Sequence, residues 1–106
     1  MDELSPVDRV EAIMGIIAGK WKPAIVYALV MEGPLRFVEL RRRIPKVSQR
    51  MLTQQLRELE RDGIVHRKVY AEVPPKVEYS LTAVGKELRP LLTAMHKWGT
   101  AYSRGR

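Results

Sequence analysis

The chain has 106 residues, contains no cysteine and carries a formal net charge of +7 at pH 7. This length is typical of one domain with one modest core. Without thiols, disulfides, cysteine zinc sites and thiol redox sensing are excluded. The hydrophobic share of 45% excludes a disordered chain. No apolar run approaches the roughly 18 to 20 residues that span a bilayer, and no signal peptide is visible. We therefore expect one cytoplasmic domain over residues 1–106, with no membrane partner.

The positive charge is concentrated in the middle of the chain. Between Arg36 and Lys68 there are ten basic residues and four acidic ones, a net charge of +6. A surface charge that only kept the protein in solution would be spread more evenly. Such a concentration indicates an anionic partner, and nucleic acid is the usual one.

The first part of the chain predicts two helices. Residues 6–17 place apolar side chains at helical spacing, with Ser5 as the N-cap and Pro6 in the first helical position. Residues 21–31 are apolar on nearly every face, which is typical of a buried central helix. Gly33-Pro34 ends that helix, and residues 35–37 form either a short strand or an extended entry to the next element.

The middle of the chain predicts two more helices. A short helix over residues 37–43 is closed by Pro45, with Val38, Leu40 and Ile44 as its candidate inward residues. The helix that follows begins at Ser48, its N-cap, and ends at Gly63. One of its faces is apolar, and the opposite face is polar and basic. The apolar stripe consists of Leu52, Leu56 and Leu59.

A hairpin and a last helical region complete the chain. Residues 64–70 and 76–81 predict two strands joined by a stiff, proline-bearing tip. Thr82 caps the last helical region, which Pro90 should kink or split near residues 87–89, and Gly99 is expected to loosen its end. Apolar residues of this region follow a heptad-like seam. They are Val84, Leu88, Leu91, Met95, Trp98 and Tyr102.

A short helix, a turn and a second helix with a basic outer face are typical of a helix-turn-helix, and the hairpin adds a wing. Arginine pairs with guanine and glutamine with adenine in the major groove, while basic residues near the helix hold phosphates. The candidates for the recognition helix are Ser48, Gln49, Arg50, Thr53, Gln54 and Arg57. The candidates for flanking and wing contacts are Arg41, Arg42, Arg43, Lys46, Lys68, Pro74, Pro75 and Lys76.

Several long stretches carry a family resemblance. They include G-K-W-K at residues 19–22, G-P-L-R-F-V-E-L-R-R at 33–42, M-L-T-Q-Q-L-R-E-L-E at 51–60 and V-P-P-K-V-E-Y-S-L-T at 73–82. Over residues 5–99 the chain resembles the HxlR-type family of winged helix-turn-helix transcriptional regulators. The resemblance implies a mainly helical α+β fold, with a winged-helix core at about residues 21–82. It also implies dimerisation helices at about residues 5–20 and 83–103.

The resemblance further implies a homodimer built by the first and last helices. The seam read from the residues agrees with it, although the same residues also suit an intramolecular core. The candidate interface residues are Ile13, Met14, Ile17, Leu91, Met95, Trp98 and Tyr102. Several members of the family sense oxidants through a cysteine just before the first helix. Serine stands at the matching position here, Ser5, so that mechanism does not carry over.

Other functions fit the residues less well. His66 and His96 are far apart in the sequence, with no nucleophile or acid at a motif spacing, so we expect no enzyme, no metal site and no cofactor. The expected function is a regulator, with repression favoured over activation, that binds double-stranded DNA as a homodimer on a pseudo-palindromic operator. The alternative is a winged-helix module that binds protein or RNA. The sequence leaves open the operator, the regulated genes and any small-molecule effector.

Overall fold

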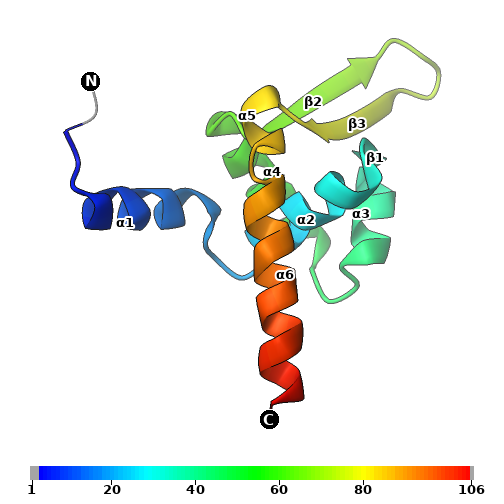
Figure 1. Ribbon diagram of the computed structural model, residues 1–106. Coiled ribbons are helices and arrows are strands. Elements are labelled where there is room, and N and C mark those ends of the chain that lie inside the picture. The colour runs from blue at the N-terminus through cyan, green and yellow to red at the C-terminus, as the bar shows by residue number, and fades with distance from the viewer. Residues whose placement is uncertain (1–2, 106) are drawn as a thin grey trace.

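The computed structural model describes residues 3–105, which form a mainly helical protein with a small antiparallel sheet (Figure 1). Its elements are α1 (Pro6–Ile17), α2 (Lys22–Glu32), β1 (Leu35–Arg36), α3 (Phe37–Arg43), α4 (Gln49–Arg61), β2 (Val65–Tyr70), β3 (Lys76–Leu81), α5 (Ala83–Lys86) and α6 (Arg89–Arg104). This is the α+β winged helix-turn-helix expected from the sequence.

Three of the helices begin at side-chain caps that the sequence predicted. The Oγ of Ser5 accepts a hydrogen bond from the backbone N–H of Asp8 at 3.1 Å. At the start of α4, the Oγ of Ser48 accepts from the N–H of Met51 at 3.0 Å. Thr82 caps α5 in the same way. Each cap satisfies a backbone donor that a helix leaves unpaired at its first turn, so these boundaries are fixed locally.

The sheet has three strands in the order β1-β3-β2, all antiparallel. The hairpin pairs Val65 with Leu81 at its base and Tyr70 with Lys76 at its tip. On the other edge of β3, Leu35 pairs with Tyr79. The segment that the sequence left as strand or extended entry is therefore a strand. It ties the start of α3 to the base of the wing.

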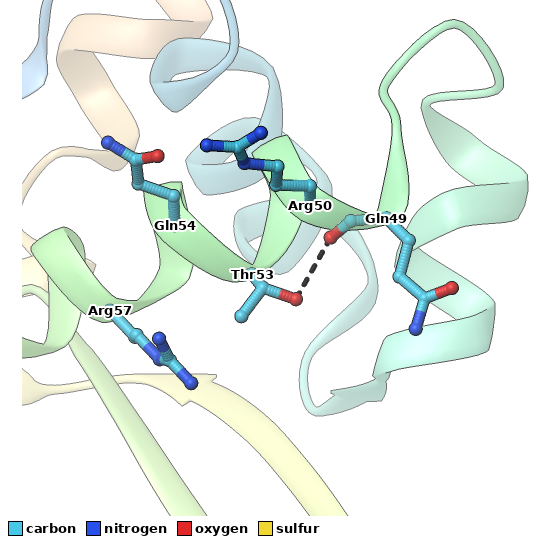
Figure 2. A pocket seen from close by; sticks show the side chains of 5 residues that line it. All are labelled: Gln49, Arg50, Thr53, Gln54 and Arg57. Atoms are coloured by element: carbon cyan, nitrogen blue, oxygen red, sulfur yellow. Dashed lines mark hydrogen bonds between the residues drawn. The ribbon is translucent and has the colours of Figure 1, made fainter.

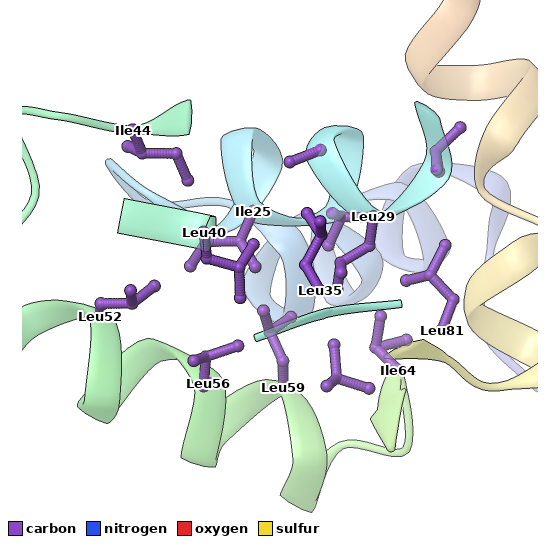
Figure 3. Close-up of a cluster of buried hydrophobic side chains, with 14 of the residues drawn as sticks. Ile25, Leu29, Leu35, Leu40, Ile44, Leu52, Leu56, Leu59, Ile64 and Leu81 are labelled. Carbon is purple, nitrogen blue, oxygen red and sulfur yellow. The ribbon is translucent and has the colours of Figure 1, made fainter. Parts of the chain in front are cut away.

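The core lies between α2, α3, α4 and the base of the sheet (Figure 3). Every element from α2 to β3, together with α6, contributes to it. Its fully buried side chains are Ile25, Val26, Leu40, Val47, Leu52, Leu56, Leu59 and Val65. Because the three leucines of α4 enter this core, the opposite face of α4 is held toward solvent.

Two sequence expectations are wrong. Val38 was expected to face inward, but its side chain is 59% exposed. The seven-residue helix α3 buries Leu40 alone, and Ile44, which follows α3, is also in the core. Gly99 does not loosen the last helix, since α6 continues through it to Arg104. The break predicted at Pro90 is confirmed, because α5 ends at Lys86 and α6 begins at Arg89.

Helices α1 and α6 project from the body of the molecule (Figure 1). The Cα radius of gyration is 15.2 Å, whereas a compact chain of this length has a radius of about 13 Å. Both helices expose large apolar side chains. These are Val7, Val10, Ile13 and Met14 on α1, and Leu91, Met95, Trp98 and Tyr102 on α6. A monomer rarely leaves so much apolar surface in contact with water.

No single helix among residues 3–105 has the length and hydropathy to cross a membrane. Helices α1 and α2 meet that test only when taken together, as a pair bent by 79°.

Candidate nucleic-acid interface

The outer face of α4 presents five polar side chains around one shallow hollow of about 600 Å³ (Figure 2). They are Gln49, Arg50, Thr53, Gln54 and Arg57. The structure thus brings together five of the six residues predicted for the recognition helix. The sixth, Ser48, lies at the start of the same helix, where its Oγ is used as the cap.

The two arginines of this face have open donors. The side chains of Arg50 and Arg57 form no ion pair or hydrogen bond within the part of the chain that the structure describes. A guanidinium carries five N–H donors in a fixed fork, which suits two acceptors on one guanine edge or a phosphate. Thr53 differs, since its hydroxyl donates to the carbonyl oxygen of Gln49 at 2.9 Å (Figure 2). Its methyl group and the acceptor lone pairs of its oxygen are then left for a ligand.

Gln54 belongs to a chain of polar contacts that reaches into the protein. Its Nε2 donates to the Oε2 of Glu58 at 3.3 Å. The other carboxylate oxygen, Oε1, accepts from the Nζ of Lys22 at 2.6 Å. Because an amide nitrogen has two hydrogens, Gln54 keeps one donor and its carbonyl oxygen for a base edge. The contacts hold this side chain on α4 and connect α4 to α2.

Sequence reasoning missed Lys22 and Glu58. Lys22 is buried, with 7% of its surface exposed, and a buried ammonium requires an opposite charge. The sequence feature that could have revealed Lys22 is a lysine at the start of a helix that is apolar on nearly every face. The partner was not visible, because it lies 36 residues away.

The Lys22–Glu58 pair is expected to make stability depend on pH. The hydrogen bond from Lys22, followed by that from Gln54, lowers the pKa of Glu58 from its ordinary value of 4.5. A carboxylate with a depressed folded-state pKa stabilises the fold fully above its unfolded value. That contribution is lost as the pH falls through the folded value. We therefore expect the stability difference between wild type and Glu58→Gln to be largest above about pH 5 and to shrink below pH 4.5.

Urea unfolding between about pH 3 and pH 7 measures this difference. Lys22→Met is the reciprocal variant, because it removes the donor and leaves the carboxylate. It should flatten the same part of the curve of unfolding free energy against pH. A difference between wild type and Glu58→Gln that stays constant at every pH would contradict the assigned role of the pair.

The arginines of α3 are not equivalent. Arg41 and Arg42 are exposed and have no ion pair within residues 3–105. Arg43 instead forms a two-point contact with Glu32 of α2, with its Nε donating to Oε2 at 2.8 Å and its Nη2 to Oε1. The hydrogen bond from Arg43 lowers the pKa of the Glu32 carboxyl. Arg43 thus fastens α3 to α2, while Arg41, Arg42 and the exposed Lys46 leave their charges to solvent.

The wing lysines lie against one aromatic ring. Lys68 and Lys76 each place their Nζ 4.7 Å from the centroid of the Tyr70 ring. The Tyr70 hydroxyl donates to the Oε1 of Glu78 at 2.7 Å, and the Nζ of Lys76 lies 3.5 Å from Oε2 of the same residue. Cation–π contact and the ion pair hold the two ammonium groups near the wing tip. Pro74 and Pro75 are exposed in that tip.

The described residues contain no group of three or more histidine, aspartate or glutamate side chains that would hold a metal ion. The chemistry of the face formed by α3, α4 and the wing is that of hydrogen-bond donors and cations. That chemistry suits a phosphate backbone and base edges.

A helix-turn-helix formed by α3 and α4, followed by the β2–β3 wing, defines a winged-helix DNA-binding transcriptional regulator. The family model described as "HxlR-like helix-turn-helix" matches residues 16–105, and the chain belongs to this family. The resemblance predicted from the sequence is thereby confirmed. Members of the family that match this chain are named as transcriptional regulators, not enzymes.

Among the relatives is YdeP of Bacillus subtilis, an uncharacterised HTH-type transcriptional regulator. It is 56% identical over 93 residues, which are 88% of this chain and 72% of that protein. The solved structure of the redox regulator HypR in its oxidised form is 54% identical, with a TM-score of 0.83 over 88% of this chain and 95% of that one. The structure of ytcD, described as an HTH-type transcriptional regulator, is 46% identical. Its TM-score is 0.85, over 95% of this chain and 99% of that one.

Proposed function

We propose that the protein is a homodimeric repressor that reads a pseudo-palindromic operator through α4. The observation that carries this proposal is the outer face of α4, where Arg50 and Arg57 have open donors and Gln54 keeps a donor and an acceptor. These groups match the edges of guanine and adenine in the major groove. A protein seated on a promoter in this way excludes polymerase, so repression is the expected outcome.

The exposed apolar stripes of α1 and α6 support the homodimer. Six of the seven residues predicted for the interface have exposed side chains. Ile17 is the exception, since it is 6% exposed and packs within its own chain. We therefore propose an interface without Ile17, formed by Ile13, Met14, Leu91, Met95, Trp98 and Tyr102.

Two copies of α4 would lie in successive major grooves about 34 Å apart. Arg41, Arg42 and Lys46, just before α4, would contact the phosphates beside each groove. The wing, with Lys68 and Lys76 near its tip, would lie along the adjacent backbone or minor groove. In this arrangement phosphate contacts position the protein and α4 supplies the sequence preference.

The regulatory signal differs from a thiol switch. HypR is titled a redox regulator with an oxidised form, but this chain has no cysteine. Ser5, at the position expected for a sensing cysteine, caps α1 through its hydroxyl. We therefore propose a trigger that does not act through a thiol.

Selection from a random duplex DNA library, at near-physiological salt, tests the proposed function. The expected result is an enriched motif with two half-sites, whose centres lie about 10 base pairs or a multiple apart. A motif with one half-site would contradict the homodimer. Absence of any enrichment, with binding to RNA or to protein instead, would favour the interaction module over the regulator.

Arg50→Ala separates base reading from phosphate binding. It is expected to weaken binding to the enriched operator by about 1–3 kcal/mol and to relax the preference at one position, because the guanidinium pairs with a base. Lys76→Ala is the comparison, since it should weaken all sequences alike and lower the salt slope by about 1. Fluorescence anisotropy on matched and mismatched duplexes over a salt series measures both. Unchanged affinity in both variants would refute the assignment of these surfaces.

A further inference from the structure

A second cavity lies away from α4, and its lining comes from the end of α2, the residues that follow it, the end of β3, α5 and the start of α6. Its volume is about 370 Å³, which is within the range of small-molecule sites, about 300–1,000 Å³. That space equals about a dozen water volumes of about 30 Å³ each. The cavity is therefore large enough for a benzoate-sized molecule.

One part of this cavity is apolar and another is cationic. Leu29, Pro34 and Leu81 contribute hydrocarbon surface, and Val30 lies beside them. Lys86 of α5 and Arg89 of α6 bring two positive charges. No aspartate or glutamate belongs to the lining, and no carboxylate within residues 3–105 pairs with either cation.

Both cations border the cavity, where positive charge favours an anion. Arg89 is positioned by a long contact, its Nη1 lying 3.5 Å from the carbonyl oxygen of Val30, and its other donors remain open. The half-buried Ser80 adds a hydroxyl to the lining. A few polar groups that converge beside an apolar wall are the usual composition of a ligand site.

We propose that this cavity binds a small amphipathic carboxylate. Its apolar body would lie against Leu29, Pro34 and Leu81, and its carboxylate would lie between Lys86 and Arg89. Charge complementarity selects the ligand class, since a neutral ligand would leave both cations unused and a cationic ligand would be repelled. A carboxylate accepts two parallel N–H donors from one guanidinium, which Arg89 can supply.

The cavity lies on the side of α6 opposite the exposed apolar residues proposed for the dimer interface, which we call the dimer stripe. Arg89 and Leu91 are two positions apart, which places them about 200° apart around a helix of 3.6 residues per turn. The site therefore stays open when Leu91, Met95 and Trp98 are covered by a second copy. It also contacts β3, which continues into the wing, and α6, which carries the stripe.

A ligand bound in this cavity can thus shift the positions of the wing and of α6 together. This regulatory consequence rests on the proposed function, whereas binding itself does not. The two therefore need separate measurements, with binding measured in the absence of DNA.

The test follows backbone amide signals by ¹H–¹⁵N NMR while benzoate is added to the full chain at about 0.15 M salt. The expected shifts cluster at Leu29, Val30 and Ser80. Benzyl alcohol, which keeps the ring without the charge, should bind at least about tenfold more weakly, because it lacks charge-assisted hydrogen bonds. Shifts that cluster on α3 or α4 instead would mean that benzoate only titrates the basic DNA face, which would overturn the proposal.

Lys86→Gln with Arg89→Gln removes both cations and should lower benzoate affinity at least about tenfold, without changing the affinity for benzyl alcohol. Lys97→Gln is the matched control, because it removes a lysine from an exposed position of α6 outside the cavity. It should leave benzoate affinity unchanged. Equal loss in the control, or undiminished binding in the double variant, would overturn the site. Neither result changes the expected DNA selection, so failure of this site and failure of the proposed function remain distinguishable.

Discussion

Replacing Trp98 by glutamate is expected to turn the proposed homodimer into monomers of 12.2 kDa. In the isolated chain this side chain is 67% exposed and stacks on Tyr102, with ring centroids 4.9 Å apart. A carboxylate introduced at the centre of an apolar stripe would be buried without a partner on association, which costs several kcal/mol. Light scattering coupled to size exclusion measures the mass directly.

Affinity for the operator should also decrease when the dimer is lost. A monomer engages one half-site, so it loses the second, effectively intramolecular contact, and affinity for the operator should drop by about 100-fold or more. Affinity for a single half-site should change little, because Trp98 is an exposed residue of α6 and does not belong to the face of α4 proposed to contact DNA. Thr100→Glu is the matched control, since it places the same charge on the same helix at an exposed position about 200° around from Trp98. It should remain a dimer.

One outcome would contradict the proposed dimer interface. If Trp98→Glu stays dimeric with an unchanged circular dichroism spectrum, the stripe on α6 is not the interface. We expect the variant to stay folded, because Trp98 is outside the core and substitutions at exposed surface positions usually change stability by less than about 0.5 kcal/mol.

Local chemistry explains which parts of the fold were predictable from the sequence. The caps at Ser5, Ser48 and Thr82 act within three residues, and the leucine stripe of α4 repeats within one helix. The proline in α6 breaks the last helical region by removing a backbone donor. The recognition-helix residues could be found for the same reason, since five of them share one helix face.

Contacts between distant segments were not predictable from the sequence. Lys22 meets Glu58 across 36 residues, and Arg43 meets Glu32 across 11. As a result, Arg43 was grouped with the free arginines of α3, although it pairs with α2. Ile17 was placed in the dimer stripe because helical spacing does not say which side of a stripe meets its own core. Three-dimensional packing supplies that information.

Gly85 is another residue whose role depends on distant packing. A Cβ atom at this position would overlap the carbonyl oxygen of Ile64 and lie 3.3 Å from the Cδ2 of Leu81. The Ile64 oxygen already accepts a hydrogen bond from the backbone N–H of Thr82 at 3.0 Å. Helix α5 therefore lies directly against the backbone where β2 starts, and only glycine permits this approach.

Gly85→Ala is expected to lower the free energy of unfolding by about 1–3 kcal/mol, because the backbone at Ile64 must move to relieve the overlap. Urea unfolding at equal protein concentration measures the change, since stability of a dimer depends on concentration. Val84→Ala is the matched control. It produces the same residue one position earlier, where the side chain is 60% exposed, and should change stability by less than about 0.5 kcal/mol. Equal effects of the two substitutions would show that helix α5 tolerates a side chain at Gly85. That outcome would contradict the role of the close approach to Ile64 in holding α5 between the wing and α6.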